Sequence, residues 1–234
     1  GLATEWLIGQ GLRINENTII SHEGQSDGLI EALAATNEIT LEAWIKQEEF
    51  EQSGPARIIT LSTDNSERAV TLAHEGNMAY YNYVSRLNTS QTDINGIPQL
   101  ITDQDFISPS LHHVVYTRNS QGNEKIYVNG MVLASDNREG DFSSWDENYQ
   151  FALVNEITID RPWKGILYLV AVYDKALNSE EVYQNYESGF GQIRFTTELD
   201  TLESNVDYQL KPFINTDQGL VYGKVKDFIY QNVA

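Results

Sequence analysis

The fold is decided between Trp163 and Gly189, where the chain reads WKGILYLVAVYDKALNSEEVYQNYESG. Residues 166–173 are apolar without interruption and rich in branched and aromatic side chains, so both faces of the strand that they predict need cover. Asn178 is a helix-capping residue, and Glu181 follows it at the spacing of a capping box. We therefore expect a central strand of a sheet, followed by one short amphipathic helix that ends at Gly189.

The composition is that of a folded, acidic protein without cysteine. Its 234 residues are 41% apolar and 11% aromatic, which suffices for one large β domain or for one domain with an appendage. With 34 acidic and 15 basic residues the formal charge is −19, which disfavours nucleic acid and anionic membranes as partners. The lack of cysteine excludes disulfides, thiolate metal sites and cysteine nucleophiles. The opening residues GLATEW match no signal peptide, so we expect a mature or excised piece.

Alternation and turn residues predict further strands. In residues 38–46 apolar and polar side chains alternate, which predicts one face on the core and one toward solvent, with Trp44 on the polar face. Asn129 and Gly130 separate two short β runs, which predicts a type I′ hairpin turn. A helical turn is expected near residues 29–34. The other predicted strands span residues 5–14, 18–21, 58–61, 69–72, 78–87, 111–116 and 151–154. This pattern predicts an all-β sandwich.

Three segments carry a resemblance to a known family. TNEITLEAWIK (residues 36–46), LHHVVYTRNSQGNEKIYVNG (111–130) and RPWKGILYLVAVYDKALNSEEVYQNYESG (161–189) resemble the signature segments of laminin G-like, concanavalin A-like jelly-roll domains. The resemblance covers about residues 1–190. It implies a two-sheet antiparallel jelly-roll sandwich in an exported, multidomain setting. It is poorly specific for function, because such sandwiches serve as lectins, carbohydrate-binding modules, adhesion domains and enzyme scaffolds.

Residues 191–234 predict a separate β appendage of three strands, at residues 193–199, 208–214 and 220–229. Within it, LESNVDYQLKPFINTDQGLVYGKVKDF (residues 202–228) resembles the last strands of a bacterial fibronectin type III-like module. Three strands are marginal alone, so we expect this tail to dock on the jelly roll. The alternative is that these strands pair with a neighbouring chain.

No catalytic motif of the resembling enzymes is present. Laminarinase-type glucanases with this fold use Glu-x-Asp-x-Glu on one strand, which the chain lacks, and the Gln-x-His strand of alginate-lyase-type jelly rolls is also missing. The histidines show no metal-ligand spacing; they are His22, His74, His112 and His113. We therefore expect a protein that is not an enzyme, with an enzyme of unrecognised type acting on polysaccharide as a less favoured alternative.

Candidate binding residues are aromatic side chains that could stack on sugar rings and arginines that could bind hydroxyl groups. The candidates are Trp145, Tyr149, Arg161, Trp163, Tyr81, Tyr83 and Arg86. The long acidic loop at residues 135–149 also holds Asp136, Asp141 and Asp146, weak candidates for a calcium site. For each of these residues, a structural role or a solvated surface is the competing interpretation.

The sequence therefore favours a non-catalytic, extracellular binding module of a larger secreted or cell-surface protein, with a glycan or an extracellular protein as partner. The alternative is a structural or adhesion subunit of an extracellular assembly, which contacts neighbouring domains through exposed strand edges.

Overall fold

The computed structural model divides the chain into two compact units, residues 1–192 and residues 193–234. The structure describes residues 2–7, 11–21, 26–50, 54–77, 80–103, 109–190, 202–211, 213–216, 219–222 and 225–229. No helix within these ranges is long and apolar enough to cross a membrane. Each unit is described by itself below.

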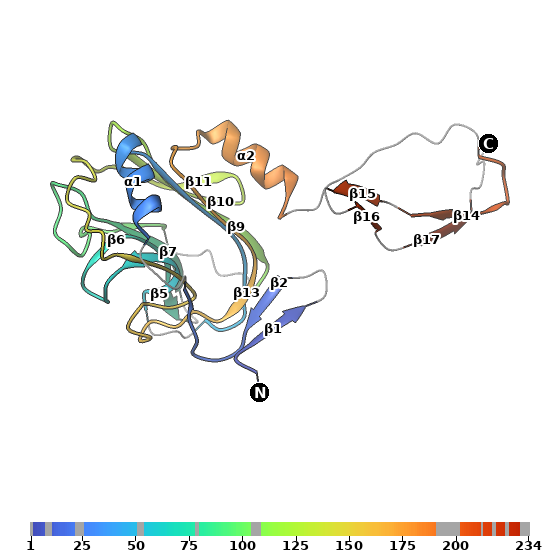
Figure 1. Ribbon diagram of the computed structural model, residues 1–234, viewed down its shortest axis with the longest axis horizontal. Coiled ribbons are helices and arrows are strands. Elements are labelled where there is room, and N and C mark those ends of the chain that lie inside the picture. The colour runs from blue at the N-terminus through green and yellow to red at the C-terminus, as the bar shows by residue number, and fades with distance from the viewer. Residues whose placement is uncertain are drawn as a thin grey trace. The chain divides into compact units, whose positions relative to one another are not determined.

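The first unit is a sandwich of two antiparallel sheets (Figure 1). The seven-stranded sheet has the order β1 (Thr4–Leu7), β2 (Gly11–Ile14), β13 (Gly165–Tyr173), β4 (Ile39–Gln47), β9 (Leu111–Arg118), β10 (Asn123–Val128), β11 (Met131–Asn137). The six-stranded sheet has the order β3 (Ile20–Ser21), β12 (Gln150–Leu153), β5 (Ala56–Ser62), β6 (Arg68–Asn77), β7 (Tyr80–Leu87), β8 (Leu100–Ile101). The predicted jelly-roll sandwich is confirmed.

The core lies between the two sheets. Alternate residues of β4 point into it, and Leu41, Ala43 and Ile45 are almost fully buried. The six-stranded sheet contributes Leu61 and Leu72 among others. At about 25 cal/mol for each Å² of apolar surface removed from water, this shared interior is the main source of the unit's stability.

Strand β13 covers the predicted central run, and it lies between β2 and β4 in the sheet. Its pairing with β4 runs from Gly165 to Tyr173, with one irregularity, whereas its pairing with β2 ends at Leu167. Residues 168–173 are accordingly half-buried. The prediction of a strand within the sheet is confirmed, but full burial on both faces holds only for the first part of the strand.

The described part of the chain has two helices beside the sheets, where the sequence predicted one helix and one helical turn. Helix α2 (Ser179–Ser188) has the predicted capping box, because the Asn178 side chain accepts from the main chain of Glu181 while the Glu181 side chain accepts from the main chain of Asn178. Helix α1 (Asp27–Thr36) extends the helical turn expected near residues 29–34 to a full helix. It inserts Ile30 and Leu33 into the core, so tertiary burial offsets its weak local pattern.

Helix α2 explains why Trp44 lies on the polar face of its strand. The Trp44 ring stacks on His113 with 4.7 Å between ring centroids and on Tyr186 of α2 with 5.9 Å. Phe190, just after the helix, contacts the same ring at 5.7 Å. The outer face of β4 is therefore covered and Trp44 is 6% exposed, which corrects the prediction that this face looks to solvent.

The β10–β11 hairpin has the predicted type I′ turn. Asn129 and Gly130 both have positive φ, 51° and 78°. A type I′ turn requires positive φ at both central residues, and Asn and Gly adopt positive φ more readily than other residues, which is why an Asn-Gly pair connects the strands.

Within its described residues, the second unit has four short strands. β14 (Asp207–Leu210) pairs with β17 (Lys226–Ile229), and β15 (Phe213–Thr216) pairs with β16 (Gly219–Tyr222). The predicted strand at residues 208–214 is thus two strands, and the break contains Pro212, whose nitrogen has no hydrogen to donate to a sheet. The predicted strand at residues 193–199 lies outside the described residues, and docking of this unit stays a prediction.

Candidate functional site

Four arginines gather on the face of the six-stranded sheet that is turned away from the core. They are Arg57, Arg68, Arg86 and Arg161, half of the eight arginines of the chain. We call this surface the arginine face. The charges of Arg57 and Arg161 lie close enough to affect one another, as do those of Arg86 and Arg161. Such a gathering is unusual in a chain of net charge −19.

Strand register builds the arginine face. Thr60 of β5 lies opposite Thr71 of β6, and Thr71 lies opposite Arg86 of β7. Because side chains alternate along a strand, all three point away from the core residues next to them. The two threonine hydroxyls are 2.8 Å apart, and Arg86 Nε donates to the Gln99 side chain at 3.0 Å. A polar row therefore crosses the sheet.

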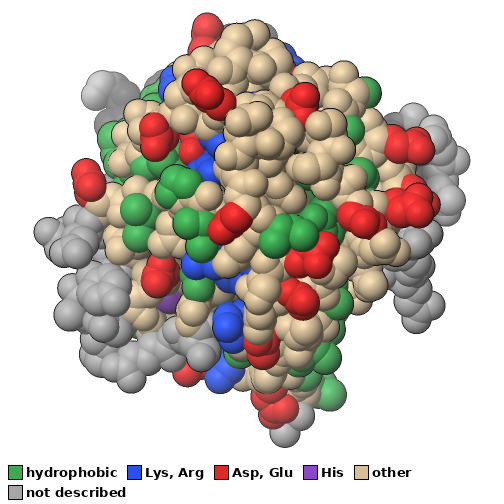
Figure 2. Space-filling view, turned by 90° about the vertical axis from the view of Figure 1, so that its left-hand side faces the viewer, with side chains coloured by type: hydrophobic (Ala, Val, Ile, Leu, Met, Phe, Trp, Pro, Cys, Tyr) green, Lys and Arg blue, Asp and Glu red, His purple; other side chains and the backbone are tan. Residues whose placement is uncertain are grey.

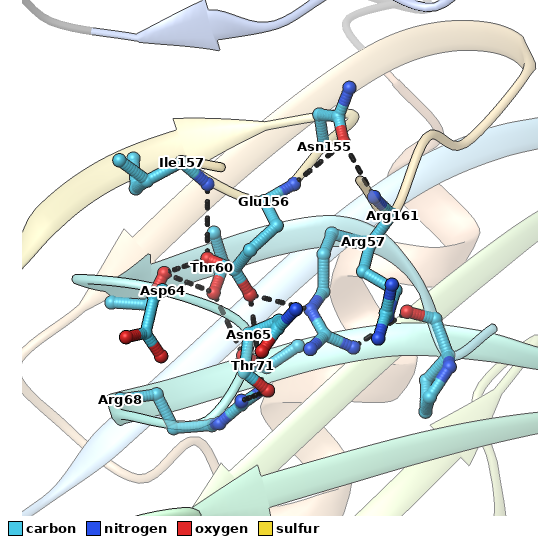
Figure 3. Close-up of polar contacts among 12 residues, drawn as sticks. Arg57, Thr60, Asp64, Asn65, Arg68, Thr71, Asn155, Glu156, Ile157 and Arg161 are labelled. Atoms are coloured by element: carbon cyan, nitrogen blue, oxygen red, sulfur yellow. Dashed lines mark hydrogen bonds and ion pairs between the residues drawn. The ribbon is translucent and has the colours of Figure 1, made fainter. Parts of the chain in front are cut away.

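Glu156 holds the buried part of the arginine face together (Figure 3). Its carboxylate accepts from Arg57 Nε at 2.9 Å, from the main-chain nitrogen of Ile157 at 3.0 Å and from the Ser62 hydroxyl. Arg57 Nη1 donates to the Pro55 carbonyl at 2.6 Å. Arg57 and Glu156 are 1% and 0% exposed, so this ion pair stays out of water and each charge depends on the other.

Asn155 fixes the loop that delivers both Glu156 and Arg161. Its side-chain oxygen accepts from the main-chain nitrogens of Glu156 at 2.9 Å and of Arg161 at 3.0 Å. The Arg161 carbonyl in turn accepts from the main-chain nitrogen of Arg57 at 3.0 Å. Figure 3 shows Arg57 and Arg161 on the same side of Glu156. The positions of these groups are therefore set before any ligand arrives.

Arg68 is the most constrained charge of the group. Its side chain is fully buried, and its Nε and Nη1 have no hydrogen-bond partner; Nη1 lies 3.9 Å from the Glu156 carboxylate. Burial and the nearby charge of Arg57 lower the pKa of Arg68 to about 10. Two buried guanidinium groups thus share one buried carboxylate.

Arg86 and Arg161 form the solvent-facing part of the arginine face. Arg161 is 30% exposed and pairs through Nη1 with Asp160 at 2.9 Å. Arg86 is half-buried, and its hydrogen bonds go to two neutral amide oxygens, of Gln99 and of Asn95 at 3.3 Å. Burial lowers the pKa of Arg86, the charges of Glu75 and Asp93 oppose this effect, and the charge of Arg161 adds to it. Both side chains are held in place while part of each guanidinium group stays accessible.

Figure 2 looks onto the side of the molecule where Figure 1 labels β5, β6 and β7. Lys and Arg side chains gather in a narrow strip across the middle of this side, and Asp and Glu side chains spread around it. Positive charge on this side is therefore local, within a surface that is otherwise acidic.

Three of the predicted sugar-stacking aromatics lie in the core. Tyr83, Tyr149 and Trp163 are each exposed by 1% or less. The Tyr83 hydroxyl bonds His112 Nδ1 at 2.7 Å, and Trp163 Nε1 donates to the Gln47 side chain at 2.7 Å. No ring face is left for a sugar, so the ligand-binding prediction does not fit the placement of these three residues. The three rings belong to the hydrophobic core instead.

The other two aromatic side chains predicted to bind sugar are those of Trp145 and Tyr81. Trp145 is partly buried: its ring stacks on Phe142 with centroids 4.2 Å apart, and Nε1 donates to the main chain of Asn88 at 2.8 Å. The side chain of Tyr81 lies outside the described residues. Of the predicted binding residues, Arg86 and Arg161 belong to the arginine face, and ligand binding by either one stays a prediction.

The three aspartates proposed for calcium do not converge. The Asp136 carboxylate accepts from the main chain of Asn137, that of Asp141 from Ser143, and that of Asp146 from Asn148. Each side chain is exposed and accepts from a residue one or two positions later in the chain. In the ranges that the structure describes, no three His, Asp or Glu side chains form a metal-binding group.

Neither Glu156 nor Arg68 was among the residues predicted from the sequence. One hint was present, since Arg57 and Arg68 each directly precede an apolar strand run. Trp6 was also not singled out, although it is 78% exposed on the edge strand β1.

A second polar cluster lies beneath α2. Glu42 accepts from His113 Nε2 at 2.8 Å, from the Tyr173 hydroxyl at 2.7 Å and from the Asn185 side chain at 2.9 Å. An acid beside an imidazole resembles catalytic machinery. Here both groups are at most 4% exposed and the helix covers them, so a substrate has no access.

Comparison with known proteins places the chain among β-sandwiches of one superfamily. A sequence model described as the concanavalin A-like lectin/glucanases superfamily matches residues 23–183. No curated protein matches the chain.

Solved structures show the same fold at low sequence identity. The CBM40 of the Ruminococcus gnavus IT-sialidase is similar with a TM-score of 0.54 and 17% identity, over 75% of this chain and 95% of that one. Trypanosoma rangeli sialidase has a TM-score of 0.56 and 17% identity, over 81% of this chain and 29% of that one. A heptameric SAP-like pentraxin from Limulus polyphemus has a TM-score of 0.50 and 16% identity, over 63% of this chain and 69% of that one.

Proposed function

The chain belongs to the concanavalin A-like lectin/glucanases superfamily, and from that premise we propose that it is a non-catalytic glycan-binding module of an exported protein. The proposed binding surface is the arginine face. The fold gives only the general expectation, because sandwiches of this kind carry many functions. The assignment to a glycan comes from the side chains on this surface.

The observation that carries the proposal is the partial exposure of Arg86 and Arg161, together with the hydrogen bonds that hold both side chains in place. Both are partly exposed, and both are held by hydrogen bonds to neighbouring side chains. Amide and carboxylate groups lie around them, on Gln99, Asn95 and Asp160. Such donors and acceptors on a rigid sheet match the hydroxyl-lined rim of a sugar, since side chains that are already ordered lose little conformational entropy on binding.

The placement of two groups of ionisable side chains supports the proposal of binding without catalysis. The acid and imidazole of Glu42 and His113 are closed off beneath α2. On the arginine face, Glu156 is fully buried and neutralises Arg57, so it cannot act as an acid or a nucleophile on a sugar. The buried positions of Glu42, His113 and Glu156 support a module that holds a polysaccharide for the benefit of other domains.

A structural or adhesion role is the second candidate. Edge strand β1 carries Trp6, 78% exposed, and the nearby Leu2 is 77% exposed. Bulky apolar side chains on a free sheet edge favour contact with another protein. This candidate predicts assembly of the purified chain, which the glycan-binding proposal does not need.

The test is a glycan-binding screen of the full chain by glycan array and affinity gel electrophoresis. Binding to at least one glycan is expected, with loss of binding in Arg161→Ala. Arg13→Ala is the matched control, because Arg13 is a partly exposed arginine on the other sheet and pairs with Glu48 at 3.0 Å. The proposal would be refuted if no glycan on the array bound the chain and no polysaccharide in the gel slowed its migration. Hydrolysis of a polysaccharide by the chain, detected as new reducing ends, would also refute it.

A further inference from the structure

The arginines of the described chain differ in how their charge is neutralised. Arg13, Arg57, Arg138 and Arg161 each pair with a carboxylate at 3.0 Å or less. Arg118 is fully buried and donates to main-chain carbonyls. Arg86 has no ion pair with any described carboxylate, although the chain holds 34 acidic residues. The carboxylates of Glu75 and Asp93 act on Arg86 through their charge only, without an ion pair. Among the described arginines, Arg86 is thus the partly exposed one whose hydrogen bonds go to neutral groups alone.

Hydrogen-bond donors remain unused around Arg86. Its bonds to described residues use Nε and Nη1, which leaves Nη2. Arg161 uses Nη1 alone, which leaves Nε and Nη2. A guanidinium offers five N–H donors and no acceptor, so the missing partner is an acceptor. A carboxylate is the best match, because it accepts two parallel N–H bonds and carries the opposite charge.

The surrounding charges favour an anion at this point. Arg57 and Arg68 share one carboxylate, that of Glu156, and the charges of both interact with that of Arg86. An anion bound at Arg86 and Arg161 would reduce the mutual repulsion of the four guanidinium groups. The protein as a whole repels anions, so the attraction is confined to contact distance and depends on geometry.

We infer that the arginine face recognises carboxylate-bearing glycans, with Arg86 and Arg161 binding the carboxylate of a uronic or sialic acid residue. This inference rests on the proposed glycan-binding function and names the ligand class. Uronates and sialates share the recognised chemistry, and the experiment distinguishes these two sources.

The experiment measures affinity of the full chain by calorimetry for matched acidic and neutral glycans. Polygalacturonate is compared with its carboxyl-reduced form, and sialyllactose with lactose; poly-glutamate tests whether any polymer of carboxylates suffices. We expect binding to an acidic glycan at least about tenfold tighter than to its neutral counterpart. Binding of poly-glutamate as tight as that of the best glycan would overturn the inference in favour of an acidic protein partner.

Variants connect the preference to the two arginines. Arg86→Gln and Arg161→Gln should each weaken acidic-glycan binding by about tenfold or more, while Arg13→Gln, which removes the same charge on the other sheet, should change it less than about twofold. Arg86→Lys keeps the charge but loses the planar fork and should also weaken binding. Unchanged thermal unfolding of each variant shows that folding is retained.

The outcomes separate the two levels of the proposal. Equal affinity for acidic and neutral glycans, or full binding by Arg86→Gln and Arg161→Gln, overturns the carboxylate inference and leaves glycan binding standing. Absence of binding to every glycan, acidic or neutral, refutes the proposed function itself.

Discussion

The substitution Glu156→Gln tests whether the arginine face is pre-organised by one buried charge. The carboxylate accepts from Arg57 Nε at 2.9 Å and from the main chain of Ile157 at 3.0 Å, and it lies 3.9 Å from Arg68. Gln keeps the shape but removes the charge and turns one acceptor into a donor. Removing one partner of a buried ion pair costs about 3–5 kcal/mol, so we expect the free energy of unfolding to fall by that amount.

The assay is urea unfolding followed by tryptophan fluorescence. All four tryptophans lie within residues 1–192, so the signal reports the first unit alone. Glu48→Gln is the control: it breaks a partly exposed pair with Arg13, and we expect a loss below about 1 kcal/mol. A change below about 1 kcal/mol for Glu156→Gln as well would show that Glu156 does not hold the arginines in place.

Three further predictions concern the sheet that α2 covers and the two helices. Burial raises the pKa of Glu42, but hydrogen bonds from His113 and Tyr173 outweigh it, so the folded-state pKa lies below the ordinary value of 4.5. The contribution of Glu42 to stability is thus present above pH 4.5 and lost as the pH falls through the folded-state pKa. In acid unfolding, the stability of Glu42→Gln should depend less on pH in that range than the stability of the unmodified chain. The same pH dependence in both proteins would contradict this. Gly130→Ala should cost about 1–3 kcal/mol by urea unfolding, because Gly130 has a φ of +78° and a Cβ would lie 3.0 Å from Tyr183. Gly28→Ala, in α1 with no atom within 4 Å of the added carbon, should instead be neutral or stabilise by up to about 1 kcal/mol; equal losses at both sites would contradict the role of φ. Asn178→Ala removes the cap of α2 and should cost about 1 kcal/mol by the same assay, and no measurable loss would show that packing alone holds the helix.

Features encoded in neighbouring residues could be predicted from the sequence. The strand at residues 165–173, the Asn178 capping box and the Asn129–Gly130 turn each depend on a few consecutive side chains. The burial of Trp44 could not be predicted, because the alternation of side chains shows which face of the strand a residue lies on but not which element covers that face. Its cover is α2, which returns to the sheet from more than 100 residues later in the chain.

The candidate site was only partly predictable for the same reason. Arg86 and Arg161 could be named as exposed polar candidates. Their environment depends on Glu156, which reaches Arg57 across 99 residues of sequence. Burial of Tyr83 and Trp163 could not be predicted for another reason, because each combines a polar tip with a large apolar ring and fits a core as well as a binding surface.

The most direct test of ligand binding at the arginine face is a titration followed by the NMR signals of the arginine Nε–H groups. A uronate or sialate oligosaccharide is added to the labelled full chain, and the signals are assigned through Arg86→Gln and Arg161→Gln. The account predicts saturable shifts of the Arg86 and Arg161 signals, with Arg13 and Arg118 unchanged. Saturable shifts confined to other arginines, or no shift at a ligand concentration that saturates binding, would contradict it.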